Sequence, residues 1–143
     1  MIRSGMSSLV VTSIETEADT VTRLLGIAPT EVTRKGAARR SGRVRDHNTW
    51  SLEIETLGNT DDDQTGTRAL RDILDRCRPA CGRIRALPTD CEARIWWSGD
   101  SDSTQGGFVL AADLASQIAE FGVDVYATVY LEDDDRAEES GPG

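Results

Sequence analysis

The 143-residue sequence has few of the side chains on which most catalytic sites depend. It contains a single histidine, His47, and a single lysine, Lys35. No Ser/His/Asp or Cys/His set is evident, and no glycine-rich phosphate loop follows an expected strand at the required spacing. An enzyme is therefore the minority hypothesis, and no cofactor is expected.

Long apolar runs are absent as well. No stretch approaches the ~20 apolar residues of a membrane helix, and the N-terminal sequence MIRSGMSS lacks the apolar core of a signal peptide. We therefore expect a cytoplasmic protein without membrane association. The length suits one domain, which we place at residues 8–131, between a flexible leader (1–7) and a disordered acidic tail (132–143).

Three cysteines are too few for a disulfide framework or an ordinary zinc site. Cys77 and Cys81 are four residues apart, but Pro79 between them breaks the helix that would align their thiols. Zinc prefers four Cys or His ligands, and beyond Cys91 the only candidate is His47, in a segment whose positive charge repels a cation. We expect no metal and three buried free thiols.

Charge is distributed unevenly. The formal net charge is −9 and the pI is about 4.6, which argues against general nucleic-acid binding and suits a basic protein partner. Residues 34–47 are the exception, because six basic residues there face only Asp46. We expect this segment to be exposed and mobile. It is either a solvated hairpin loop or an arginine-lined site for phosphate or carboxylate groups, which guanidinium groups bind bidentately.

Two segments are similar to a known family. Residues 24–36, LLGIAPTEVTRKG, precede a lone tryptophan at the start of an expected strand, and residues 109–130 read VLAADLASQIAEFGVDVYATVY. Both resemble the domain of unknown function 4279 family of bacterial proteins. The resemblance implies the architecture of that family, which has no established activity.

Hydrophobic periodicity predicts strands and helices in alternation. Strands are expected over residues 8–14, 30–34, 50–55, 93–98, 108–110 and 123–131, with helices ending at Gly26, near Pro79 and at Gly122. The order β-α-β-β-α-β-β-α-β predicts an α+β fold. We expect a mostly antiparallel sheet with helices on one face, built as a ferredoxin-like βαββαβ core with a βαβ extension.

Trp50 begins a strand in which Trp50, Leu52 and Ile54 alternate with polar residues. It is expected in the core or at its rim, and the neighbouring arginines give it a second candidate role as a stacking platform for a ligand. The candidate binding residues are therefore Arg34, Lys35, Arg39, Arg40, Arg43, Arg45, His47 and Trp50.

Two acidic stretches resemble known motifs. Asp61, Asp63, Thr65, Gly66 and Asp72 fall at positions 1, 3, 5, 6 and 12 of a calcium loop, but a strand precedes them and position 12 lacks the usual Glu. We interpret these acids as caps of the next helix. The D-x-D-x-T sequence of residues 100–104 resembles a phosphatase nucleophile motif, but no parallel βαβ series follows, so we expect a polar hairpin.

These observations favour a small cytoplasmic binding module, of the immunity or adaptor type, that engages a protein partner. The alternative is a sensor of an anionic small molecule or nucleotide, bound at residues 34–47 beside Trp50. A third hypothesis is an enzyme that uses the acidic loops with a divalent metal.

Overall fold

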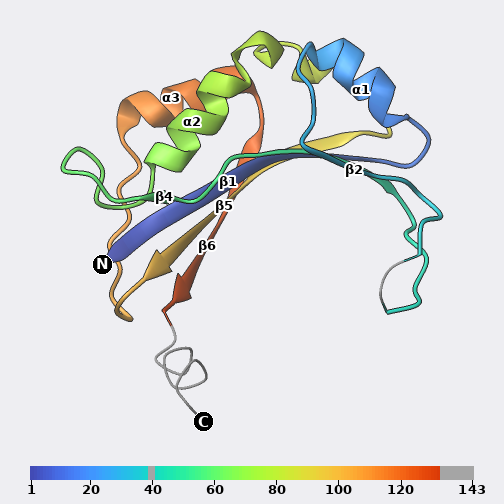
Figure 1. Ribbon diagram of the computed structural model, residues 1–143. Helices are drawn as coiled ribbons and strands as arrows, with labels where there is room; N and C mark the ends of the chain where they lie inside the picture. Colours follow the sequence, from blue (N-terminus) through green and yellow to red (C-terminus); the bar gives the residue numbers. More distant parts are fainter. Residues whose placement is uncertain (39–40, 133–143) are drawn as a thin grey trace.

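The computed structural model describes residues 1–38 and 41–132, which form one six-stranded sheet and three α-helices (Figure 1). In chain order the elements are β1 (Ile2–Ser13), α1 (Ala18–Leu25), β2 (Glu31–Thr33), β3 (Asn48–Glu53), β4 (Leu57–Gly58), α2 (Arg68–Arg76), the short 3-10 turns η1 (Arg78–Ala80) and η2 (Ile84–Ala86), β5 (Glu92–Ser101), α3 (Ala112–Phe121) and β6 (Asp124–Leu131).

The strands lie in the order β2-β3-β1-β5-β6, and the short β4 pairs with the N-terminal part of β1. Neighbouring strands are antiparallel except β5 and β6, which are parallel because α3 connects them as a crossover. The three α-helices cover one side of the sheet (Figure 1). We call the other side the open face. The α+β class, with a mostly antiparallel sheet, is thus confirmed.

The core lies between the sheet and the helices, on the residues that the alternation marks. Leu9 and Val11 of β1 pair with Leu52 and Trp50 of β3, and each of the four side chains is at most 7% exposed. α2 adds the buried stripe Ala69, Leu70, Ile73 and Leu74. Each large apolar side chain buried in this way contributes about 1.5–3 kcal/mol, so this layer is the main source of stability.

Trp97 lies on the helix side of β5, in a space that three glycines leave open. Its indole N–H donates to the carbonyl of Gly66 at 2.9 Å. A Cβ atom on Gly99 would lie 2.5 Å from the Trp97 ring, and one on Gly5 would lie 2.8 Å from the indole nitrogen. Only glycine therefore permits this close approach of backbone and ring.

The expected flexible leader is wrong, because β1 begins at Ile2. The Ile2 side chain is fully buried, and the Ser7 hydroxyl donates to the carbonyl of Ala69 in α2 at 2.6 Å. Residues 1–7 lack the β-branched run that marks the strand expected over residues 8–14, so the sequence gives no strand signal there. Hydrogen-bonded pairing with β4 and β5 holds these residues in a strand although their local propensity does not favour one.

The expected strand over residues 108–110 is also wrong. These residues form an exposed connection between β5 and α3, and the ring of Phe108 packs 4.9 Å from that of Trp97. In contrast β4 pairs with β1, although no strand was expected between residues 55 and 93. The expected disordered tail falls, from residue 133 onward, outside the described residues. Within the described ranges, no helix has the length and apolar character needed to cross a bilayer.

Candidate functional site

Residues 34–38 and 41–47 form an arm that projects from the sheet between β2 and β3, below the sheet in Figure 1. The N–H of Gly36 donates a hydrogen bond to the carbonyl of Arg45 at 2.9 Å, and the N–H of Arg45 donates one to the carbonyl of Ala37 at 3.0 Å. An isolated bridge joins Ala38 to Val44. The arm is therefore closed as a hairpin at its base.

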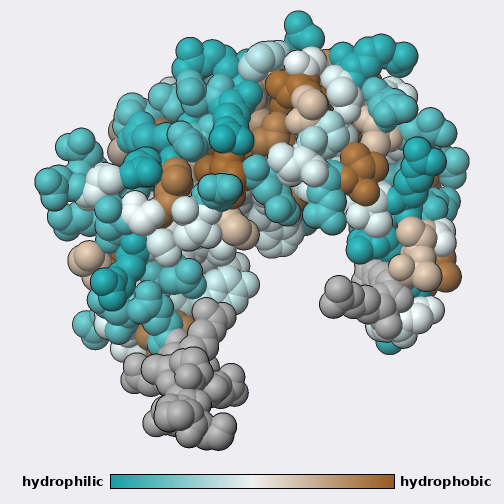
Figure 2. Space-filling model, viewed as in Figure 1, coloured by the Kyte–Doolittle hydropathy of each residue, from teal (hydrophilic) through white to brown (hydrophobic). Residues whose placement is uncertain are grey.

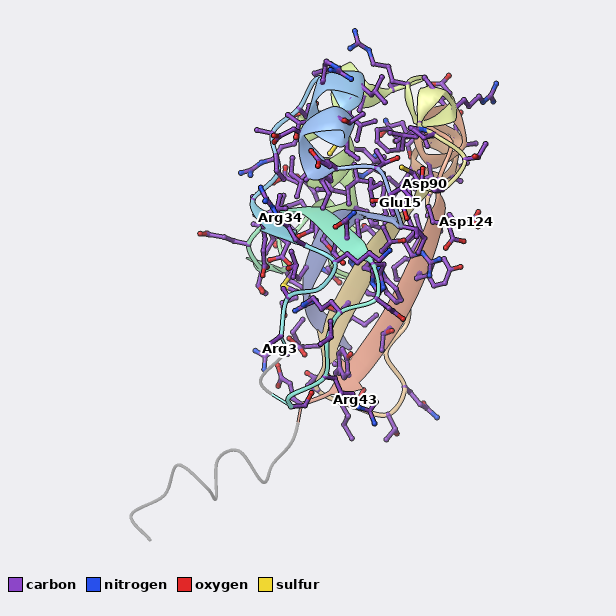
Figure 3. The ribbon with its side chains drawn as sticks, turned by 90° about the vertical axis from the view of Figure 1, so that its right-hand side faces the viewer. Arg3, Glu15, Arg34, Arg43, Asp90 and Asp124 are labelled. Carbon is purple, nitrogen blue, oxygen red and sulfur yellow. The ribbon has the colours of Figure 1, made fainter. Side chains whose placement is uncertain are left out.

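The structure separates the basic residues that the sequence groups together. Lys35 lies at the base of the arm, where its Nζ is 3.6 Å from the Glu15 carboxylate. Arg34 and Lys35 both line a small cavity beside the start of α1. Figure 3 shows Arg34 near the base and Arg43 near the far end of the arm. Acidic neighbours thus offset part of the charge at the base.

The remaining predicted residues lie at different places. Arg45 and His47 are half-buried on the returning half of the arm, and Nδ1 of His47 lies 2.5 Å from the Asp46 carboxylate. Arg39 and Arg40 fall outside the described residues.

The role proposed for Trp50 as a stacking platform is wrong. Its side chain is 1% exposed and faces the helices, whereas the arm projects on the open face (Figure 1). The indole N–H donates to the Thr22 hydroxyl in α1 at 3.0 Å. Trp50 is therefore a core residue, in line with the other interpretation of its alternation.

The open face has an aromatic cluster of its own, on β5 and β6. The rings of Trp96 and Tyr126 lie 5.0 Å apart, and both side chains are about 40% exposed. The Arg94 guanidinium lies 4.6 Å from the Tyr126 ring and 5.8 Å from the Trp96 ring, within the range of a cation–π contact. Glu92 pairs with Arg94 at 3.2 Å. We call Arg94, Trp96 and Tyr126 the open-face cluster.

A cavity of about 860 Å³ joins the arm to this cluster. Val10 and Thr12 of β1 lie between its two walls. One wall is formed by Asp46 and His47, where the arm returns to the sheet, and the other by the start of β5. Figure 2 shows the molecule hollowed below the sheet and its helices. The residues lining the cavity are Val10, Thr12, Ser13, Ile14, Asp46, His47, Thr89, Asp90, Cys91, Glu92, Arg94 and Trp96.

Asp90 fixes the end of this cavity nearest α1. Its carboxylate accepts hydrogen bonds from the Thr16 hydroxyl (2.7 Å), the Thr16 N–H (2.8 Å) and the Glu15 N–H (2.9 Å). These bonds, the one from the Thr16 hydroxyl first, hold the pKa of Asp90 well below its usual range. Figure 3 shows Asp90 beside Glu15. Asp90 thereby ties the segment before β5 to the turn after β1.

The sequence contains a signal for the open-face cluster that the prediction did not use. Trp96 occupies a polar position in the alternation of β5, and Tyr126 and Tyr130 do so in β6. Aromatic side chains on the solvent-exposed side of two strands indicate a candidate interaction surface. That the two strands are neighbours is not readable from the sequence.

The acidic motifs have structural roles. Asp63 accepts hydrogen bonds at the start of α2 from the N–H groups of Thr67 and Arg68, as expected of a capping acid. Asp102 accepts one from the N-terminal amine of Met1 at 2.6 Å. Across residues 1–38 and 41–132, no group of three or more Cys, His, Asp or Glu side chains is arranged to hold a metal ion.

The three cysteines are free thiols in different surroundings. Cys77 is buried, and burial raises its pKa to about 11. Cys91 is half-buried, and desolvation also raises its pKa. Cys81 is exposed, so the expectation of three buried thiols is wrong for this residue.

Comparison with known proteins gives a family and no function. No curated protein and no solved structure matches the chain. A family model described as a domain of unknown function, DUF4279, matches residues 3–132, which include every described helix and all but the first residue of the sheet. The chain therefore belongs to the DUF4279 family.

Proposed function

We propose that the protein is a small cytoplasmic binding module that engages a protein partner on the open face of its sheet. The observation in favour is the exposed open-face cluster of Arg94, Trp96 and Tyr126. Trp, Tyr and Arg are the residues most enriched among those that dominate binding energy at protein interfaces. An uncovered sheet face that served only to meet water would instead present small polar residues.

The shape and charge of the hollow favour a protein over a small molecule. Small-molecule pockets enclose most of their ligand, whereas this hollow is broad and open below the sheet (Figure 2). The arm carries Arg43 and Arg45, whereas the acidic Glu92 and Asp124 begin β5 and β6. A partner with complementary charges at its two margins would be oriented across the cluster. An immunity-type or adaptor role, holding another protein, fits this surface.

The test is site-specific photo-crosslinking in the native host. A photoreactive amino acid at Met6, which lies on the open face of β1 and is 41% exposed, should yield one crosslinked protein. The same group at the exposed Gln117 of α3 is the matched control and should not. Replacing Trp96 and Tyr126 by alanine should abolish the Met6 crosslink. Equal crosslinking from both positions, or no effect of the alanine pair, would contradict the proposal.

A second candidate is a sensor of an anionic small molecule or nucleotide. The cavity of about 860 Å³ supports it, since this volume lies within the range of ligand sites and Arg94 and His47 line the walls. A nucleotide at ~100 times its dissociation constant should stabilise the protein by about 2.7 kcal/mol. Arg94→Gln should remove that stabilisation and Arg76→Gln on α2 should not. No rise in melting temperature with any nucleoside phosphate would exclude this candidate.

The finer topology is part of the proposal. The order β2-β3-β1-β5, with α1 and α2 on one side, supports a ferredoxin-like core to which α3 and β6 add a parallel strand through a βαβ crossover. An experimental structure in which β5 does not lie beside β1 would contradict it.

A further inference from the structure

The outer edge of β6 is the starting point. β6 pairs with β5 on one side, and within the described part of the chain no segment pairs with its other side. The N–H of Glu132, directly after β6, donates to the carbonyl of Ser101 in β5 at 2.6 Å. Peptide groups of successive strand residues point in alternate directions. Those of Val125, Ala127, Val129 and Leu131 therefore point away from the sheet.

This edge lacks the features that normally prevent strand pairing. Natural edge strands are kept short or carry charges, proline or bulges. β2, at the opposite edge, has only three residues, with Glu31 within it and Arg34 directly after it. In contrast, residues 125–131 contain no charge and no proline. Val129 is 47% exposed and Tyr130 58%.

We propose that β6 pairs antiparallel with β6 of a second copy of this chain, which joins the two sheets into one across a two-fold axis. The charges at the ends of the strand favour a second copy in this orientation. Asp124 begins the strand and Glu132 follows it. Parallel pairing would place like acids side by side. Antiparallel pairing separates the two Asp124 side chains by roughly 20 Å at ~3.3 Å per residue, beyond the screening length of ~8–10 Å.

The same charges select the register. With the two-fold axis at Ala127, Val125 faces Val129 of the second copy and Tyr126 faces Thr128. With the axis one residue further, at Thr128, Asp124 would face Glu132 across the ladder, and opposed like charges destabilise a pair. The first register also pairs the outward peptide groups of Ala127 with each other. The contact is isologous, as a two-fold dimer requires.

This pairing goes beyond the proposed function. It joins the sheets edge to edge, so it leaves Arg94 and Trp96 of the open-face cluster uncovered. The two open faces would then form one continuous surface with two equivalent clusters. Binding of a partner and pairing of β6 can therefore fail independently in experiment.

Sedimentation of the full-length protein tests the pairing. At about 100 µM the wild type should sediment at twice its chain mass of 15.5 kDa, with a mass that falls on dilution. Val129→Lys places a charge in the middle of the edge and should sediment as a monomer. Val32→Lys makes the same change on the opposite edge, in β2, at a side chain that is 41% exposed, and should behave as wild type.

Hydrogen exchange identifies the edge itself. The amides of Val125, Ala127 and Val129 should exchange slowly in concentrated protein and at least tenfold faster on dilution to monomer. In Val129→Lys they should exchange at the fast rate at every concentration. A wild type that stays monomeric overturns the proposal. So does a dimer that both lysine variants weaken equally, or one in which these three amides exchange fast at every concentration. Protection of the amides only when another protein is added would also overturn it.

Discussion

Asp63 holds the start of α2 through four hydrogen bonds. Its carboxylate accepts from the N–H groups of Thr65 (3.1 Å), Thr67 (3.2 Å) and Arg68 (2.7 Å) and from the Thr67 hydroxyl (3.0 Å). Alanine at this position would leave these donors without their acceptor. α2 places Leu70 and Ile73 in the core, so loss of its first turn affects global stability.

The expected cost of Asp63→Ala is about 1–2 kcal/mol in the free energy of unfolding, as for removal of other helix-capping side chains. For a chain of this length the entropy of unfolding is roughly 0.3 kcal/mol per degree near 60 °C, so the melting temperature should fall by roughly 3–7 °C. Asp63→Asn should cost less, because its amide oxygen still accepts hydrogen bonds.

The effect should depend on pH. Partial burial alone would raise the pKa of Asp63, but hydrogen bonds from Arg68, Thr65 and Thr67 outweigh burial and lower the pKa. The folded pKa therefore lies below the unfolded value of about 3.9. Such a group stabilises the protein fully above the unfolded pKa and loses that contribution as pH falls through the folded pKa. The gap between wild type and Asp63→Ala should be constant near pH 6–7 and narrow below about pH 4.

Urea unfolding followed by circular dichroism measures this gap, with Asp61→Ala as the matched control. Asp61 is exposed in the same loop, so its loss should change stability by less than about 0.5 kcal/mol. The reasoning is refuted if both variants are equally destabilised at pH 7. It is also refuted if the gap for Asp63→Ala widens on acidification.

Three further changes test other parts of the molecule. Gly99→Ala should lower the free energy of unfolding by about 1–3 kcal/mol because its Cβ would overlap an indole ring, whereas Gly107→Ala, in open space, should be tolerated; equal effects in urea unfolding would contradict this. Cys77 should resist a thiol reagent at pH 8 in the native protein while the exposed Cys81 reacts, and labelling of both without unfolding would be the opposite result. Asp90→Ala should accelerate amide exchange in the turn after β1 and leave α2 unchanged; unaltered exchange in the turn would show that the three hydrogen bonds are dispensable.

Local periodicity was sufficient to predict the buried layer. The alternation around Leu52 is that of a strand with one covered side, and the spacing of Leu70 and Ile73 is that of a helix with one buried stripe. Both patterns reflect which side chains are buried within a single element, so they can be read without knowledge of the neighbouring elements. Gly122 also ends α3 in the left-handed conformation, with φ of 89°, as the sequence indicates.

Features that depend on strand neighbours could not be predicted in this way. Ile2 and Gly5 belong to the central strand only because β4 and β5 pair with it, and nothing local to residues 1–7 indicates this. The open-face cluster likewise depends on pairing of Trp96 with Tyr126, thirty positions later in the chain. The arm shows the opposite error, since charges that are close in sequence, such as those of Arg34 and Arg43, lie at opposite ends of the arm (Figure 3).

The space occupied by Trp97 also bears on how the family can diverge. Gly5, Gly66 and Gly99 come from three separate parts of the chain, but the indole ring is the first obstacle to a side chain only at Gly99. A Cβ atom on Gly5 would lie 2.4 Å from the Gly66 carbonyl oxygen, and Gly66 has a φ of 77°, so both positions favour glycine whatever residue replaces the tryptophan. Relatives that keep tryptophan here should therefore keep all three glycines. Relatives with a smaller residue at the position of Trp97 should accept alanine or serine at the position of Gly99 and still keep glycine at the other two.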